Sequence, residues 1–288
     1  MKNTLRNIYA VLPFKKEIFL ILRLFPMPER VFRHLHFEGL ITVGVEQRAF
    51  KMYHYGYQLE NELFWRGING GWEKVSMKVW IALSKRSTNI LDIGANTGVY
   101  ALVSKAVNPN SRIFAFEPVK RVFEKLKRNA EINNFDITSV CQGISDFEGT
   151  ATIYDLPTDH VYSVTINQNT NPPDRTVIPT QVEVITLDAY CEQVGLDHID
   201  LLKIDVETHE PSVLRGALRI LRKSKPPMII EILNDVVAAQ VNELLNEFDY
   251  LYFALNEKSG PIPCDRVGAL DFGNYLVCKR SDAEFLKL

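Results

Sequence analysis

The chain has 288 residues, a length that suits one sizeable domain with an extension better than two independent domains. Hydrophobic residues make up 46% and charged residues 24%, the ordinary mixture of a soluble globular enzyme. The net charge of −2 argues against a general electrostatic attraction to nucleic acid, so we expect no nucleic-acid partner.

The N-terminal segment contains an apolar run at residues 18–25, which Arg23 interrupts and Pro26 follows. The run is too short to span a bilayer, and no small-residue cleavage site follows it. Residues 1–30 carry six basic and two acidic side chains, so weak peripheral contact with an anionic membrane is one interpretation. We favour the other, a helix packed on the body of the protein.

A cap is expected before the main domain. Residues 37–57 are rich in β-branched and aromatic residues and predict a small hairpin around residues 46–48. Residues 61–83 have a largely helical pattern, which the pair Gly70–Gly71 interrupts. Neither segment has the pattern of an independent unit, so we assign residues 1–84 to an N-terminal cap of helices and a β-hairpin.

From about residue 85 strands and helices alternate, which is typical of a parallel α/β sheet. Strands are expected at residues 89–93, 112–116, 138–144, 200–206 and 227–233, followed by an antiparallel pair near 250–255 and 274–280. Helices are expected at residues 97–107, 119–130 and 213–221 and up to about residue 248. The fold class of residues 85–288 is therefore α/β, with a Rossmann-like, mostly parallel sheet and an antiparallel edge strand.

The four cysteines lie far apart and form no C-x-x-C pair: Cys141, Cys191, Cys264 and Cys278. This spacing argues against a structural zinc site and against a disulfide framework. We expect scattered buried thiols in a reducing compartment, and therefore a cytoplasmic protein.

A glycine-containing loop lies where the first strand of the sheet ends and a helix begins. Its sequence is Leu91-Asp92-Ile93-Gly94-Ala95-Asn96-Thr97-Gly98. Glycines let the backbone approach a ligand closely, and the free N–H groups of the first helical turn attract an anionic group. Glu117 closes the next strand beside the same crevice, where a carboxylate can accept hydrogen bonds from two ribose hydroxyls.

The spacing of this loop distinguishes two nucleotide ligands. In a dinucleotide site, G-x-G-x-x-G, the second and third glycines counted from Gly94 would fall on Asn96 and Val99. The chain instead has G-x-x-x-G with Asp92 two residues ahead, which favours a single adenosyl ligand whose methionine part lies against the loop. A purely structural glycine pair is the alternative, weakened because Asp92 and Glu117 end adjacent strands at the ligand-binding edge.

Three further motifs follow the glycine loop. They are Phe116-Glu117-Pro118, Gly143-Ile144-Ser145-Asp146 followed by Glu148-Gly149, and Lys203-Ile204-Asp205-Val206-Glu207-Thr208-His209-Glu210. With these motifs, residues 89–233 resemble the FkbM-type methyltransferases, a family of the class I methyltransferase superfamily with the patterns F-E-P, S-D-x-x-G and K-I-D-V-E-G-x-E. Thr208 stands where the family usually has glycine; if that glycine serves a positive φ, a threonine there is strained.

The resemblance implies a methyltransferase that uses S-adenosylmethionine. The cofactor-binding residues that it implies are Asp92, Gly94, Asn96, Gly98, Glu117, Pro118, Ser145 and Asp146. The first four would line the methionine end of the cofactor, and Glu117 would hold the ribose. Ser145 and Asp146 would lie near the adenine, although a turn role explains Asp146 equally well.

Acidic and imidazole side chains cluster at the end of the fourth strand. An alcohol or amine acceptor loses a proton when it is methylated, and a carboxylate or histidine can take that proton. Asp205 and Glu207 would point to the same side of a strand, and paired carboxylates raise one pKa. We therefore predict Asp205 or Glu207 as the catalytic base, with His209 as the alternative. Helix capping by Thr208 or Glu207 is the competing explanation.

Two other groups of residues have more than one interpretation. Glu231 and Asn234 could join Asp205 in an all-oxygen Mg²⁺ site, but we favour a strand-end carboxylate bonded to backbone N–H groups and predict no metal. The ring-bearing residues Tyr53, His54, Tyr55, Tyr57 and Trp65 form either an acceptor lid or the core under a cap. The same two interpretations apply to His160 and Tyr162, which precede a proline-broken loop at residues 167–180 that we expect to be mobile.

The sequence therefore predicts a methyltransferase that acts on the hydroxyl group of a small molecule or glycan, with the acceptor class implied by the resemblance. An NAD-dependent oxidoreductase is one rival, which the missing glycines disfavour. A non-catalytic adenosyl-binding or scaffold protein is the other, which Thr208 supports. The sequence leaves open the oligomeric state and the choice between an oxygen and a nitrogen acceptor.

Overall fold

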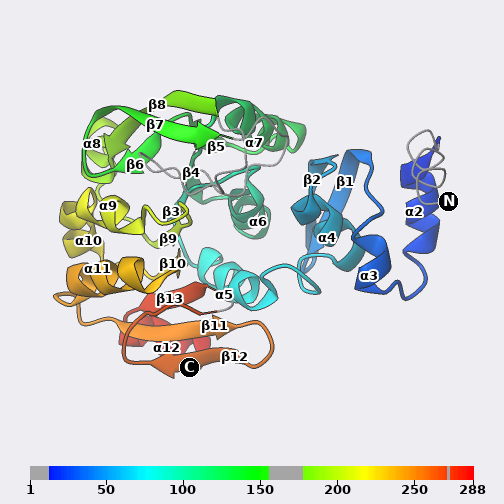
Figure 1. Ribbon diagram of the computed structural model, residues 1–288. Coiled ribbons are helices and arrows are strands. Elements are labelled where there is room, and N and C mark those ends of the chain that lie inside the picture. The colour runs from blue at the N-terminus through cyan, green and yellow to red at the C-terminus, as the bar shows by residue number, and fades with distance from the viewer. Residues whose placement is uncertain (1–12, 156–177, 271–272) are drawn as a thin grey trace.

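The computed structural model describes residues 13–155, 178–270 and 273–288 and has an eight-stranded sheet at its centre (Figure 1). In spatial order the strands are β12 (Gly260–Cys264), β11 (Leu251–Asn256), β13 (Asn274–Cys278), β10 (Met228–Glu231), β9 (Leu201–Ile204), β3 (Asn89–Ile93), β4 (Arg112–Phe116) and β5 (Ile137–Val140). The strands from β10 to β5 pair in parallel, and β13, β11 and β12 add antiparallel pairs beyond β10. The predicted fold class is confirmed.

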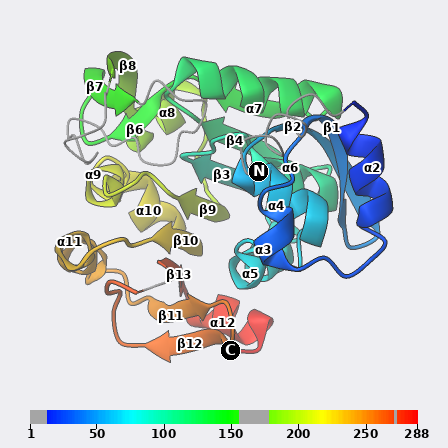
Figure 2. The same ribbon diagram turned by 45° about the vertical axis from the view of Figure 1, so that its right-hand side comes forward.

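The N-terminal segment surrounds a hairpin with helices. Its elements are α2 (Lys15–Leu22), α3 (Glu29–Phe32), β1 (Glu38–Val45), β2 (Arg48–Tyr55), α4 (Gln58–Arg66) and α5 (Lys74–Ser84). β1 and β2 form the predicted antiparallel hairpin, and Gly70–Gly71 lies between α4 and α5, where a break is expected. Figures 1 and 2 place α2 at the outer edge of the molecule, with the hairpin between it and the sheet.

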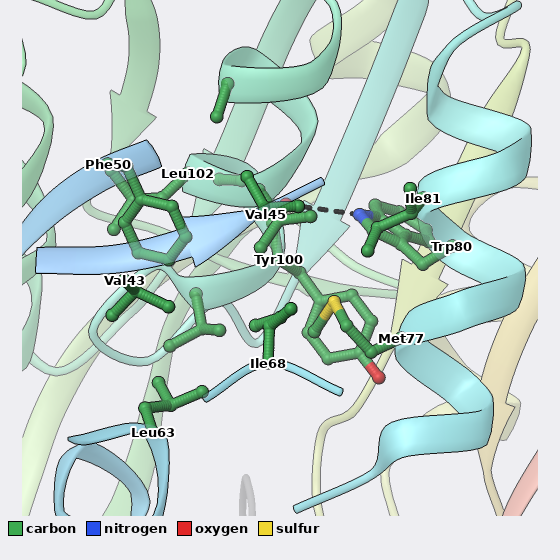
Figure 3. Packing of buried hydrophobic residues seen from close by; sticks show 14 of the residues in the cluster. Val43, Val45, Phe50, Leu63, Ile68, Met77, Trp80, Ile81, Tyr100 and Leu102 are labelled. Atoms are coloured by element: carbon green, nitrogen blue, oxygen red, sulfur yellow. Dashed lines mark hydrogen bonds between the residues drawn. The ribbon is translucent and has the colours of Figure 1, made fainter. Parts of the chain in front are cut away.

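The cap and the sheet share one hydrophobic cluster, shown in Figure 3. Val45 of β1 and Met77 and Trp80 of α5 pack around Tyr100, which belongs to α6 (Val99–Val107). The indole N–H of Trp80 donates to the Tyr100 carbonyl oxygen at 3.1 Å and to the hydroxyl of Ser104 at 2.7 Å. Because buried polar groups cost free energy unless they are paired, these bonds fix α5 against α6.

The helix α2 packs on the cap through a single buried side chain. Phe19 contacts the rings of Phe37 and Trp65 at centroid distances of 6.0 and 5.7 Å, as expected for a helix that rests on the protein body. Leu20 and Ile21 of α2 are exposed, and so are Phe14 and Leu24, which flank the helix; the contact with a membrane surface stays a prediction. No helix among the described residues is long and apolar enough to cross a membrane.

Helices cover both faces of the sheet, because successive strand residues point to opposite faces. The remaining helices are α7 (Lys120–Ile132), α8 (Leu187–Gln193), α9 (Glu210–Arg215), α10 (Leu218–Ser224), α11 (Asp235–Leu245) and α12 (Arg280–Leu286). Ile90 and Leu201 pack with α5 and α6, whereas Leu91 and Leu202 pack with α8 to α11. By the same alternation Asp92 and Lys203, which are register partners, lie on the α5 and α6 face.

The structure departs from the sequence-based expectations in several elements. The strand predicted at residues 138–144 divides between β5 and β6 (Gly143–Ser145); β6 belongs to a separate sheet with β8 (Ile178–Thr186) and β7 (Gly149–Asp155). The helix predicted at residues 213–221 is two helices, α9 and α10, which are separated at Gly216 and Ala217. Gly216 lies so close to the end of β6 that a Cβ there would be 1.9 Å from the Ser145 carbonyl oxygen. The edge strand β12 is not predicted, since it contains two prolines, which sheets accept at their edges.

Part of the predicted loop lies outside the described residues. His160, Tyr162 and most of residues 167–180 fall in the undescribed range, and their roles stay predictions. Residues 178–180 are described and belong to β8 rather than to a loop.

Candidate active site

The chain order of the parallel strands reverses between β3 and β9. From β3 the chain passes to β4 and β5 on one side, and later to β9 and β10 on the other. Sheets of this kind bind ligands outside the carboxyl ends of the strands at such a point. A pocket of about 230 Å³ lies there. Its lining includes the predicted site residues Asp92, Gly94, Asn96, Glu117, Pro118, Asp205 and Glu207.

The two loop glycines are required by close contacts. Gly94 has φ 80°, and a Cβ there would lie 1.8 Å from the carbonyl oxygen of Asp205. Gly98 has φ 90°, and a Cβ there would lie 2.4 Å from a methyl carbon of Leu126. Both conformations favour glycine. The loop therefore lies directly against the end of β9. Gly98 immediately precedes α6 and does not line the pocket, so its cofactor role stays a prediction.

Glu117 is fixed by the backbone on both of its oxygens. Oε2 accepts the N–H of Asn96 at 3.1 Å, and Oε1 accepts the N–H of Val119 at 2.9 Å. Burial raises the pKa of Glu117 to about 7, against these two hydrogen bonds, which lower it. Each carboxylate oxygen has a second lone pair for a ligand. The side chain is thus a pre-positioned acceptor at the edge of the pocket.

Asp92 supports the first turn of α6 from beneath. Its Oδ2 accepts the N–H of Ala101 at 3.1 Å, and the residue is only 2% exposed. Burial raises the pKa of Asp92 to about 7, although the neighbouring ammonium of Lys203 lowers it. Asp92 therefore lies between the helix and the pocket, with Lys203 opposite it on β9.

Three predicted residues form a neighbouring cluster outside the pocket lining. The hydroxyl of Ser145 hydrogen-bonds Nε2 of His209 at 3.0 Å, and Asp146 pairs with Arg215 at 2.9 Å. Burial lowers the pKa of His209 to about 4, so the ring is neutral near pH 7. Residues 142–144, immediately before Ser145, line the pocket instead. The adenine roles of Ser145 and Asp146 and the base role of His209 stay predictions.

A buried lysine lies among the carboxylates. Lys203 is fully buried, and its Nζ pairs with Asp205 at 2.9 Å. Burial lowers the pKa of Lys203, but the carboxylates of Asp205, Glu73 and Glu231 outweigh burial and raise it, so the ammonium stays charged. Lysine is almost never fully buried unless it is paired. A single lysine within the otherwise apolar strand LLKI is the sequence signal for this site, although none of the sequence-based predictions gives Lys203 a role.

The segment after β9 is a tight turn rather than a continued strand. β9 ends at Ile204, and Glu207 and Thr208 have φ 52° and 79°. The expected same-side arrangement of Asp205 and Glu207 on a strand therefore does not apply. Glu210 stabilises the turn, since its Oε1 accepts the N–H of Thr208 at 3.2 Å. Neither Thr208 nor Glu207 caps α9, which begins after His209 without a side-chain cap.

Thr208 has a positive φ, the conformation that would explain the glycine usual at this position in the resembling family. Its Oγ1 is buried without a hydrogen-bond partner. Both observations indicate that threonine is strained at this position.

The magnesium interpretation loses one of its three ligands. Oδ1 of Asn234 accepts the N–H of Val237 at 2.9 Å and caps α11. Asp205 is already paired with Lys203, so the ammonium of this lysine supplies the positive charge that a metal ion would supply. In the ranges that the structure describes, no three or more His, Cys, Asp or Glu side chains are grouped to hold a metal ion.

The cap residues that line the pocket differ from the ring-bearing residues that the sequence offers as an acceptor lid. Tyr53 and Tyr55 lie beside the cations of Arg128 and Lys125 of α7, at 4.0 and 4.8 Å from the ring centres, and Trp65 is buried. None of these three rings lines the pocket: Trp65 belongs to the hydrophobic cluster under the cap, whereas Tyr53 and Tyr55 are half-buried against α7.

The pocket is instead lined by Leu59, Trp72 and Glu73 of the cap and by Tyr100 of α6. No local sequence pattern indicates these four residues, because their position depends on how the cap packs on the sheet.

Comparison with known proteins identifies a family for this chain. The family "Methyltransferase FkbM domain" matches residues 92–252. The 2-O-methyltransferase NoeI of Sinorhizobium fredii is 30% identical over 53% of this chain and 66% of its own length. The hexuronic acid methyltransferase AglP of Haloferax volcanii is 25% identical over 65% of this chain and 73% of its own length. Methyltransferase 1 of Beauveria bassiana is 31% identical over 44% of this chain and 57% of its own length.

The chain spans 57% to 66% of the length of several curated relatives that it matches. A crystal structure of a methyltransferase FkbM from Methylobacillus flagellatus aligns with a TM-score of 0.42 and 19% identity, over 66% of this chain and 43% of that one. The family match begins at Asp92, passes through the pocket-lining segments after β3, β4 and β9, and covers more than half of the 288 residues. The chain belongs to the methyltransferase FkbM domain family.

Proposed function

We propose that this chain transfers a methyl group from S-adenosylmethionine to a hydroxyl oxygen of a small sugar-like molecule or a glycan. The observation that carries the proposal is the pocket where Gly94 brings the backbone against β9 and Glu117 is fixed by two backbone N–H groups. The acceptor class is supported by two relatives, of which one is named for 2-O-methylation and the other for hexuronic acid methylation.

The pocket residues suit an adenosyl ligand that carries a methionine end. Glu117 offers acceptor oxygens for ribose hydroxyls beside Pro118, and the loop from Gly94 to Gly98 offers close approach to its backbone. Asp92 lines the pocket with a carboxyl group whose raised pKa a cationic ligand would lower. When bound, this donor supplies a methyl group on a positively charged sulfur that is already a good leaving group.

At the adenine side we assign the wall of the pocket to residues 142–144. Ser145 and Asp146 act on this wall indirectly, because their bonds to His209 and Arg215 hold the end of β6 against α9. Asn96 completes the methionine side of the loop, where its φ of 49° turns the backbone into the pocket.

The acidic residues after β9 hold the acceptor in place. Asp205 is oriented by its ion pair with Lys203 at 2.9 Å. Burial, together with the carboxylates of Asp205 and Glu210, raises the pKa of Glu207 to about 8, so Glu207 is largely protonated near pH 7. A protonated carboxyl donates a hydrogen bond, which suits an acceptor oxygen. Holding the acceptor oxygen about 3 Å from the methyl carbon, in line with the C–S bond, is the main catalytic task.

A methyl-transfer assay tests the proposal. Wild-type protein with methyl-labelled S-adenosylmethionine is offered free hexuronic acids, their methyl glycosides and short oligosaccharides. We expect label in an ether-linked methyl group of at least one acceptor. Asp205→Asn and Glu207→Gln should lower turnover and leave the dissociation constant for the donor unchanged. Donor binding without transfer to any acceptor would favour a non-catalytic adenosyl-binding protein, and wild-type rates in both variants would refute their roles.

A further inference from the structure

The cap places a carboxylate in the pocket. Glu73 follows the break at Gly70–Gly71 and immediately precedes α5, with φ 43°. Its side chain lines the pocket together with Trp72. A non-glycine residue in the left-handed region costs of order 1–3 kcal/mol, and such residues cluster at functional sites. Glu73 also lies outside residues 92–252, so the family match does not account for it.

The surroundings of Glu73 come from four elements of the core. The hydroxyl of Tyr100 on α6 donates a hydrogen bond to Glu73 Oε2, and the ammonium of Lys203 on β9 lies 5.2 Å from the centre of the same tyrosine ring. Asn274 of β13, which is the register partner of Glu231 of β10, also hydrogen-bonds Glu73. Glu73 therefore lies beside the ends of β9, β10 and β13, away from the adenosine side formed by Glu117 and residues 142–144.

Opposing effects act on the carboxyl group of Glu73, and together they raise its pKa above that of an exposed glutamate. Burial raises the pKa of Glu73, and so does the carboxylate of Asp205. The Lys203 ammonium and the hydrogen bonds from Tyr100 and Asn274 act in the opposite direction. A carboxylate with a raised pKa is more basic than an exposed one, which favours proton removal from a hydroxyl group.

The other acidic side chains near the pocket are less suited to accept a proton. Asp205 is held in an ion pair with Lys203. Burial and nearby carboxylates raise the pKa of Glu207 to about 8 and that of Glu231 to about 9, so both are largely protonated at pH 7. Asp92 lies beneath the loop with one oxygen bonded to α6.

Resting on the proposed function, we propose that Glu73 is the catalytic base that accepts the proton of the acceptor hydroxyl. The acceptor oxygen forms a bond to the methyl carbon while the C–S bond of the donor breaks and leaves its electron pair on the sulfur. The hydroxyl proton passes to a carboxylate oxygen of Glu73 and is later lost to water. Tyr100 acts as a positioning residue, since its hydroxyl holds the Glu73 carboxylate toward the pocket.

Glu73→Gln separates this role from a structural one, because glutamine keeps the shape and still accepts the hydrogen bond from Tyr100. We expect kcat to fall by about 10²–10⁴-fold, the usual contribution of a general base, and the acid limb of the pH–rate profile to disappear. The dissociation constants for S-adenosylmethionine and S-adenosylhomocysteine, measured by calorimetry, should stay within about twofold of wild type, since a twofold change is below about 0.5 kcal/mol.

Glu257→Gln is the matched control. Glu257 accepts the N–H of Val75 at 2.9 Å at the start of the same helix, but it does not line the pocket. Its variant should keep the wild-type kcat, which would show that loss of a carboxylate beside α5 is not by itself enough to stop turnover.

A stability measurement gives a readout that does not depend on activity. A folded-state pKa above the unfolded value of 4.5 means that stability falls as pH rises from about 4.5 through the folded pKa. Glu73→Gln removes this pH dependence. The melting temperature of the variant minus that of wild type should therefore increase as pH increases. A constant difference at every pH would contradict a buried, titrating Glu73.

The outcomes distinguish this role from the function on which it rests. Wild-type protein that methylates no acceptor overturns the proposed function and this role with it. An active wild type beside an equally active Glu73→Gln overturns the role of Glu73 alone. A tenfold loss of donor affinity in Glu73→Gln, with unchanged kcat at saturating donor, also overturns it and assigns Glu73 to the donor ammonium.

If Glu73→Gln fails to fold, Tyr100→Phe takes its place. The loss of the hydroxyl should raise the pKa of Glu73, shift the acid limb of the pH–rate profile upward and lower kcat. An unshifted profile overturns the role.

Discussion

At the scale of single residues, the site depends on how closely the glycine loop meets β9. A Cβ on Gly94 would lie 1.8 Å from the backbone oxygen of Asp205, and backbone cannot move aside as a flexible side chain can. This contact places the loop, the end of β9 and the pair of Asp205 with Lys203 at one point. Gly94 is therefore as necessary to the pocket as the carboxylates around it.

Gly94→Ala should lower stability by about 1–3 kcal/mol, the usual cost of an overfilled site, and should also weaken donor binding. Gly195→Ala is the control, because Gly195 has φ 63° but a Cβ there would meet nothing within 4 Å. Urea unfolding and donor calorimetry measure the two effects. Equal losses of stability in both variants would show that positive φ, rather than close approach, makes Gly94 necessary.

Thr208 allows the opposite test, since its backbone has φ 79° and its hydroxyl is buried without a partner. Thr208→Gly should raise stability by about 1 kcal/mol. A left-handed non-glycine residue costs about 1–3 kcal/mol, and part of this cost is replaced by the larger conformational entropy that glycine loses on folding. Thr208→Ala removes the hydroxyl but keeps the strain, so it should gain less. Glycine no more stable than alanine in thermal unfolding would contradict backbone strain.

At the scale of elements, three segments hold the glycine loop from behind. The hydroxyl of Thr97 donates to Glu60 of α4 at 3.4 Å, and Asn129 of α7 donates to the Thr97 carbonyl oxygen at 2.9 Å. Asn129 also accepts the N–H of Tyr53 of β2 at 2.8 Å. Because these bonds are buried and paired, the cap and α7 fix the loop even without a ligand.

Glu60 makes this support dependent on pH. Burial raises the pKa of Glu60 to about 7, compared with 4.5 in an exposed chain, so the folded state holds a proton that the unfolded state loses. This contribution is complete below about pH 4.5 and is lost as pH rises through about 7. Glu60→Gln should therefore gain up to about 3 kcal/mol of stability over wild type between about pH 4.5 and pH 8.

Urea unfolding at about pH 5 and pH 8 measures this gain. The control is Glu62→Gln, which removes the same charge at a more exposed position of α4. A difference between Glu60→Gln and wild type that does not change with pH would contradict the raised pKa.

The elements that can be predicted from sequence are those specified by local patterns. Alternating apolar strands and helices predict the parallel sheet, and the spacing of Gly94 and Gly98 with Glu117 predicts the ligand edge. Long-range packing decides the rest. Ser145 turns to His209, and Glu73 reaches the pocket only because α5 docks on α6. Neither arrangement leaves a periodic or motif signal in the chain.

At the scale of the whole molecule, the pocket concentrates carboxyl groups in a chain whose net charge is only −2. The carboxyl groups that line it and have raised pKa values are Glu73, Asp92, Glu117, Glu207 and Glu231. Among the described residues that line the pocket, Lys203 is the one lysine or arginine. A positively charged ligand would therefore lower these pKa values and release protons when it binds.

Donor affinity should consequently rise with pH between about 6 and 8, by up to about tenfold per pH unit for each proton released. S-adenosylhomocysteine lacks the sulfonium charge and should show a smaller rise. Calorimetry in phosphate and in Tris, which differ in ionisation enthalpy, counts the protons. Equal pH dependence for both ligands would contradict electrostatic recognition of the sulfonium.

Every role assigned to the site depends on S-adenosylmethionine binding in the pocket between the glycine loop and Glu117. Titration calorimetry of wild type and Glu117→Ala with S-adenosylmethionine and with NAD tests this binding most directly. We predict one donor bound per wild-type chain and no NAD binding. Glu117→Ala should lose at least about tenfold in donor affinity, because charged hydrogen bonds contribute about 1.5–3 kcal/mol. Tight NAD binding without S-adenosylmethionine binding would contradict the assignment of this pocket.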